Sequence, residues 1–200
     1  MNEHRFSLTW LIKMKLEIIE KGIPLPEGVE VQVDYHTLKV KGEKGELERT
    51  FYYPRMNMKV IDGDKGKKIV LSCKNATKND KRFLGTFESI IKNMIIGVSE
   101  GFVYKLKVCS SHFPMNVNFK DNVLFVKNFL GEKIPRTLRI PSQGVNLKIE
   151  GDTIILEGID KALVGNIAGR IEKLTRITDK DRRRFQDGIF IIEKAGKLMM

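Results

Sequence analysis

The chain carries one pattern of elements twice, and this repetition constrains its fold more than any other feature. In each half, a proline precedes two stretches that alternate apolar and polar residues: Pro26 precedes residues 29–40, and Pro114 precedes residues 115–126. Such alternation is typical of half-buried strands. A short apolar strand and an amphipathic helix follow in both halves, with corresponding positions roughly 80 to 90 residues apart. We therefore predict an α+β fold of two tandem duplicated domains.

Each copy is expected to pack a small, mostly antiparallel sheet against one helix. The first helix is predicted to be capped by Asp80 and to end at Gly97, and the second to be capped by Asp160. The predicted order is an extension, a first domain, a second domain with a basic C-terminal tail, and a short end: residues 1–13, 14–97, 98–194 and 195–200.

Gly42-x-x-Gly45 allows two interpretations. The spacing is that of the loop with which KH domains clamp RNA backbone between two helices. Here the glycines lie between two strand patterns, where a short glycine-containing connection is typical of a β-hairpin. We therefore predict a hairpin turn.

The charge of the chain favours a polyanionic partner. The net charge is +11, and the second half carries the larger share of the surplus. Such a surplus favours phosphate polymers or an anionic membrane. The membrane is the weaker alternative, because no basic segment has the wide apolar face that interfacial binding needs. Cys73 and Cys109 form no Cys-x-x-Cys pair and are expected to be reduced thiols of a cytoplasmic protein.

Basic residues of the second half form the candidate RNA-binding set. They comprise a strand group, a helix group, a tail group and one later lysine: Lys133, Arg136 and Arg139; Arg170 and Lys173; Arg176, Lys180, Arg182, Arg183 and Arg184; and Lys194. Arginine forks match phosphate geometry and stay charged at any physiological pH. If these groups converge, they form one phosphate-binding surface. The alternative is an ordinary solvated basic face.

Neither catalysis nor metal binding is expected. The three histidines are far apart in the sequence, and none has a Cys, Asp or Glu at metal-ligand spacing. Ser111 precedes His112, but a nucleophile also needs a third, orienting group in space. His112 is therefore interpreted as a structural or contact residue, and no cofactor is predicted.

Four segments together resemble a known family. They are Asn128-Phe129-Leu130-Gly131-Glu132-Lys133, residues 93–105, residues 112–117, and the tail from Lys180 to Lys194. They are similar to the sixth large-subunit ribosomal protein, the ninth in the eukaryotic numbering, in its eukaryotic and archaeal branch. The resemblance covers residues 14–194, so residues 1–13 are expected to be an extension.

The resemblance implies a fold and a role. The family has two duplicated α+β domains, no enzymatic activity and a place in the cytoplasmic ribosome, where the protein is a monomer. Its second domain binds large-subunit rRNA near the sarcin–ricin loop, and its first domain lies near other ribosomal proteins at the stalk base. Carried over by position, the RNA contacts are Lys133, Arg136, Arg139, Lys180, Arg183 and Lys194.

One alternative function uses the same basic residues. A free RNA-binding or RNA-chaperone protein would bind RNA through them without joining a ribosome. The two hypotheses differ in sedimentation, because a free protein stays in the light fractions.

Overall fold

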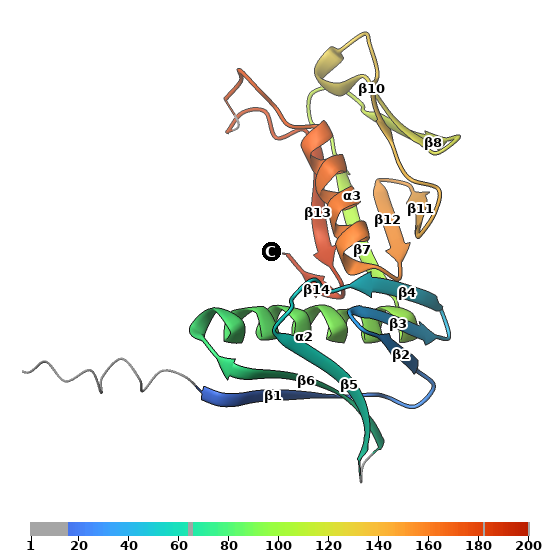
Figure 1. Cartoon of the computed structure of the whole chain (residues 1–200). Coiled ribbons are helices and arrows are strands. Elements are labelled where there is room, and N and C mark those ends of the chain that lie inside the picture. Colours follow the sequence, from blue (N-terminus) through green and yellow to red (C-terminus); the bar gives the residue numbers. More distant parts are fainter. Residues whose placement is uncertain (1–15, 64–65, 182, 200) are drawn as a thin grey trace, which may run out of the picture. The chain divides into compact units, whose positions relative to one another are not determined.

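The computed structural model describes residues 16–63, 66–181 and 183–199, and it divides into two compact units between Ser99 and Glu100 (Figure 1). In each unit antiparallel strands pack against one helix, as the predicted fold class requires. Residues 1–13, the expected extension, lie outside the described ranges. Within those ranges, neither helix is long and apolar enough to cross a membrane.

The first unit contains two three-stranded antiparallel sheets and one helix. One sheet has the order β1-β6-β5, formed by Leu16–Pro24, Gly66–Ala76 and Met56–Gly63. The other has the order β2-β3-β4, formed by Glu30–Asp34, Thr37–Gly42 and Gly45–Thr50. Helix α2 (Lys78–Ser99) packs against strands of both sheets. Fully buried Leu38, Ile69 and Ile91 come from two strands and the helix, so one core joins all three elements.

The second unit repeats this arrangement and extends it. A three-stranded sheet has the order β10-β9-β8, formed by Arg136–Arg139, Val123–Lys127 and Asn116–Lys120. A five-stranded sheet has the order β11-β12-β7-β13-β14, formed by Val145–Glu150, Thr153–Gly158, Phe102–Cys109, Gly188–Lys194 and Lys197–Leu198. Helix α3 (Lys161–Leu174) packs against β7, β12 and β13, and a 3-10 turn, η1 (Phe129–Gly131), follows β9.

Strand order confirms the duplication. The order β1-β6-β5 of the first unit corresponds to β7-β12-β11 of the second, and β2-β3-β4 corresponds to β8-β9-β10. Helices α2 and α3 follow the last of these strands in their units. Strands β13 and β14 have no counterpart in the described part of the first unit, so the second copy carries an addition at its C-terminal side.

The helix ends differ in part from their prediction. Asp160 caps α3 as expected and accepts a hydrogen bond from Ala162 N at 2.8 Å. Asp80, however, lies within the first turn of α2, where its carboxylate accepts a hydrogen bond from Thr77 N at 2.7 Å. The Thr77 hydroxyl accepts one in return from Asp80 N at 3.4 Å, so the two residues form a reciprocal capping box. Gly97 does not end α2, which continues to Ser99.

Gly42 and Gly45 form the predicted hairpin turn, as the pairing of these two residues across β3 and β4 shows. The turn also covers the end of α2, since Lys44 N donates a hydrogen bond to the Val98 carbonyl at 2.9 Å. A Cβ added to Gly42 would lie 2.7 Å from that same oxygen. The close approach of turn and helix therefore explains why position 42 is a glycine.

The C-terminal part of the segment interpreted as a basic tail is a strand. Residues 188–194 form β13, which pairs with β7 on one side and β14 on the other. The apolar run Gly188-Ile189-Phe190-Ile191-Ile192 has the β-branched and aromatic composition of a strand, and Ile189 is fully buried. The irregular basic segment is thus confined to residues 175–187, between α3 and β13.

Candidate nucleic-acid interface

The basic loop, residues 175–187, is organised by its own polar groups. The carboxylate of Asp181 accepts a hydrogen bond from Arg183 N at 2.9 Å, and its carbonyl accepts one from Phe185 N at 3.0 Å. Aspartate favours such turns because its short side chain bonds the backbone two residues onward. The turn leaves Arg183 and Arg184 exposed. Arg182, also predicted as an RNA contact, lies outside the described residues.

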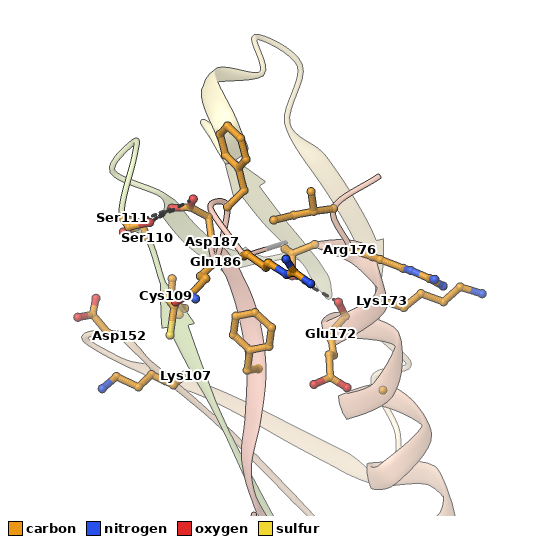
Figure 2. A pocket seen from close by; sticks show the side chains of 17 residues that line it. Lys107, Cys109, Ser110, Ser111, Asp152, Glu172, Lys173, Arg176, Gln186 and Asp187 are labelled. Atoms are coloured by element: carbon orange, nitrogen blue, oxygen red, sulfur yellow. Dashed lines mark hydrogen bonds between the residues drawn. The ribbon is translucent and has the colours of Figure 1, made fainter. Parts of the chain in front are cut away.

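A large hollow separates the basic loop from the end of α3 and the neighbouring strands. Its volume is about 1240 Å³. Its lining includes the cations Lys107, Lys173, Arg176 and Arg183 and the carboxylates Asp152, Glu172 and Asp187. Figure 2 shows Lys173 and Arg176 on one side of the hollow and the Asp187–Ser111 pair on the other. The structure therefore brings together predicted residues from the helix group and the tail group.

Two further predicted cations share a second hollow. Arg139, from β10, and Arg170, from α3, both line a space of about 500 Å³. Arg170 and Lys173 are three positions apart on α3, and side chains at that spacing are neighbours on a helix surface. Arg170 and Lys173 on α3 thus connect the cations around the first hollow with those around the second.

Arg136 has internal partners. Its guanidinium binds both carboxylate oxygens of Glu132, at 2.9 and 2.6 Å, and lies 4.3 Å from the centroid of the Phe129 ring. It also donates to the Leu174 carbonyl at 2.7 Å, at the C-terminal end of α3. A positive charge there offsets the negative end of the helix dipole. These contacts indicate that Arg136 holds β10 and the preceding loop against α3.

Lys133 and Lys194 lie apart from the two hollows. Lys133 is exposed in the connection before β10. Lys194 ends β13, opposite Tyr104, whereas Gly188 at the start of that strand is opposite Cys109. A seven-residue strand spans about 20 Å, so Lys194 is at the other end of the sheet from the basic loop.

Asp187, like Lys107, lines the first hollow and was not among the predicted residues. Its carboxylate, 4% exposed, accepts hydrogen bonds from the backbone amides of Ser111 and His112 and from His112 Nδ1 at 2.6 Å. Burial opposes its ionisation and is the largest single influence, but the hydrogen bonds together outweigh it and lower the pKa of Asp187 to about 2. The available signal was an aspartate within a basic loop, directly before an apolar strand.

Comparison with known proteins gives a consistent result. The sequence profile described as "Ribosomal protein L6" matches residues 25–101 and 113–188. A protein described as "Large ribosomal subunit protein uL6", from Nanoarchaeum equitans, is 46% identical over an alignment of 191 residues that covers 92% of this chain and 97% of that relative. Proteins with the same description from Methanosarcina mazei and Methanococcus vannielii are 42% and 41% identical, over 88% and 91% of this chain and 98% and 97% of their own lengths. The chain therefore belongs to the ribosomal protein L6 family.

Proposed function

We propose that the protein binds large-subunit rRNA near the factor-binding sarcin–ricin region through a basic surface on its second unit. Membership of the family makes it a structural ribosomal constituent and not an enzyme. The basic surface comprises the cations that line the two hollows, Arg139, Arg170, Lys173, Arg176 and Arg183, together with Lys180 and Arg184 of the same basic loop. The observation that carries the proposal is the convergence of cations from β10, α3 and the basic loop around two adjoining hollows.

The chemistry of this surface suits a folded RNA. Guanidinium groups bind phosphate oxygens through two parallel hydrogen bonds, and the hollows let cations meet a backbone from more than one side. A double-stranded RNA is recognised mostly by shape and by phosphate and 2′-hydroxyl contacts. A surface of cations held by an ordered scaffold supports that mode better than base-by-base reading.

The remaining predicted residues take different parts in the proposal. Arg136 supports the surface from within, because its guanidinium is occupied by Glu132 and by the end of α3. Lys133 and Lys194 are peripheral contacts, since each lies away from the two hollows. The first unit is proposed to face neighbouring ribosomal proteins near the stalk base, and the protein acts as a monomer in the cytoplasmic ribosome.

Charge reversal in the basic loop tests the proposal. The double variant Lys180→Glu with Arg183→Glu is expected to lose co-sedimentation with the large subunit, because phosphates would meet carboxylates in place of cations. The matched control is Lys59→Glu with Lys67→Glu, which changes the net charge equally at exposed positions of the first unit. Normal assembly of the loop variant, with circular dichroism like that of the unmodified protein, would refute the role of the loop.

Sedimentation of the unmodified protein through a density gradient decides between the two RNA-binding hypotheses. A ribosomal constituent sediments with the large subunit at physiological magnesium concentration. A free RNA chaperone stays in the light fractions, whatever its affinity for isolated rRNA. Recovery of the unmodified protein from the light fractions alone would favour the chaperone.

A further inference from the structure

We infer that Asp187 is a positioning residue, whose carboxylate fixes the basic loop in the conformation that binds RNA. The inference rests on the proposed function. It gives a part in RNA binding to a carboxylate, which is too negative to contact phosphates itself. Asp187 stands at the junction of the basic loop and β13, and it lines the same hollow as the cations. It binds the connection that follows β7, which is more than seventy residues away in sequence.

The contacts of Asp187 form a chain that reaches the RNA-binding cations. His112 donates from its backbone amide at 3.1 Å and pairs through Nδ1 at 2.6 Å with the carboxylate. The His112 ring stacks on Phe185, with centroids 4.7 Å apart and an interplanar angle of 25°. The Lys180 ammonium lies 4.9 Å from the centroid of the same Phe185 ring. Thus one buried carboxylate orients a histidine, the histidine holds an aromatic ring, and the ring holds a cation.

Few other attachments hold this part of the loop. The turn at Asp181 closes on itself, since its hydrogen bonds join Asp181 only to residues 183–185. Strand pairing begins at Gly188, opposite Cys109. Between the turn and the strand, the described side-chain hydrogen bonds from the loop to the rest of the unit are those of Asp187 to Ser111 and His112. Loss of them would leave Lys180, Arg183 and Arg184 on a loosened loop, which must then be ordered on binding at an entropic cost.

An ionised carboxylate suits this site because it can accept from every group around it. Two backbone N–H groups, a hydroxyl and an imidazole nitrogen surround Asp187. An ionised carboxylate accepts hydrogen bonds at both oxygens and presents no donor. An asparagine of equal size would lose the charge-assisted hydrogen bonds, and its NH₂ group would require the Ser111 hydroxyl and His112 Nδ1 to act as acceptors. The substitution Asp187→Asn therefore keeps the volume of the side chain and removes part of the attachment.

A positioning role for Asp187 predicts the direction in which Asp187→Asn changes the affinity for RNA. Asp187→Asn makes the protein more positive by one charge beside the basic surface. If Asp187 were only a negative charge near the phosphates, its removal would strengthen binding to RNA. A positioning role predicts the opposite result, because cations on a loosened loop bind phosphates less well.

The experiment measures the affinity of the full chain for purified large-subunit rRNA at several salt concentrations. For Asp187→Asn we expect affinity to fall by roughly tenfold, and the slope of log affinity against log salt to shrink in magnitude by about 1, as when a phosphate contact is lost. The control is Asp152→Asn, which removes an exposed carboxylate from the lining of the same hollow. Its affinity should stay equal to that of the unmodified protein or rise.

Other outcomes distinguish failure of the Asp187 positioning role from failure of the proposed rRNA binding. Equal or tighter binding by Asp187→Asn overturns the positioning role while leaving the proposed function intact. Absence of rRNA binding by the unmodified protein overturns the proposed function itself. If Asp187→Asn does not fold, His112→Gln decides, because it removes the ring stacked on Phe185 and keeps the Asp187 carboxylate in place. A folded His112→Gln variant that binds RNA as tightly as the unmodified protein refutes the inference.

Discussion

At the scale of single residues, two buried aspartates join distant parts of their units. Asp187 does so in the second unit, and Asp80 in the first. The Asp80 carboxylate, 1% exposed, accepts hydrogen bonds from the Tyr53 hydroxyl, from Thr77 and from Arg55 Nη1 at 3.3 Å. The hydrogen bond from Tyr53 is the largest cause that lowers the pKa of Asp80 to about 2, followed by the bond from the Thr77 amide. Asp80 thus fixes both the start of α2 and the segment before β5.

These two carboxylates predict an acid-sensitive stability. Each has a folded-state pKa of about 2, below the value of roughly 3.9 for an aspartate in an unfolded chain. Their contribution to stability is therefore fully present above the unfolded value, and it is lost as the pH falls through the folded value. We expect the melting temperature, followed by circular dichroism, to decline steeply between about pH 4 and pH 2.

A variant isolates the part played by Asp80. Asp80→Asn should lower the melting temperature at neutral pH, because an amide cannot accept all of these hydrogen bonds, and it should flatten the decline in acid. Asp34→Asn is the control, since it removes an exposed carboxylate from the same unit. An unchanged acid profile for Asp80→Asn would contradict this account.

At the scale of elements, the sequence predicted some boundaries and missed others for identifiable reasons. Asp160 and the Gly42–Gly45 turn followed local rules, and the structure agrees with both. Asp80 was misplaced because the threonine three residues earlier takes the capping position. Gly97 was expected to end α2, but it lies buried inside the helix. The Thr77-x-x-Asp80 capping box is a local pattern that could have been found in the sequence. The end of α2 instead depends on packing against the Gly42–Gly45 turn, which a local pattern does not contain.

Glycines inside α3 provide a test at this scale. Gly169 lies in the helix, and a Cβ added there would meet nothing within 4 Å. Because glycine costs about 1 kcal/mol relative to alanine in a helix interior, Gly169→Ala should raise the melting temperature by a few degrees, about 2 to 6 °C. Gly165 is the comparison, since a Cβ there would lie 3.3 Å from the buried Tyr104 hydroxyl oxygen. Gly165→Ala should gain less, and an equal gain at both positions would contradict the packing argument.

At the scale of the whole molecule, the charge surplus was evident in the sequence and its arrangement was not. The helix spacing of Arg170 and Lys173 already placed these two side chains side by side. That Arg139 joins Arg170, and Arg183 joins Lys173, depends on sheet order and on the course of the basic loop. In the sequence, Arg136 resembles the neighbouring predicted RNA contacts. Its bonds to Glu132 and to the Leu174 carbonyl indicate that it instead supports the end of α3.

The arrangement predicts a strong dependence of binding on salt. If about six cations of the basic surface each neutralise one phosphate, log affinity should fall with log salt at a slope near −5, and affinity should drop roughly a thousandfold between about 50 and 200 mM salt. Filter binding to large-subunit rRNA measures this slope. A slope near −1 would mean that most of these cations stay in solvent, and it would contradict the proposed surface.

The position of β13 in its sheet has a consequence for the order of events during synthesis. This strand lies between β7, made early in the second unit, and β14, near the C-terminal end of the chain. Translation proceeds from the N-terminus, so β7 is made before its neighbour β13, with most of the second unit synthesised in between. The basic loop gains its anchor at Asp187 only when β13 has emerged and paired. We therefore expect the basic loop of a nascent chain to stay without this anchor until residues 188–194 have been made.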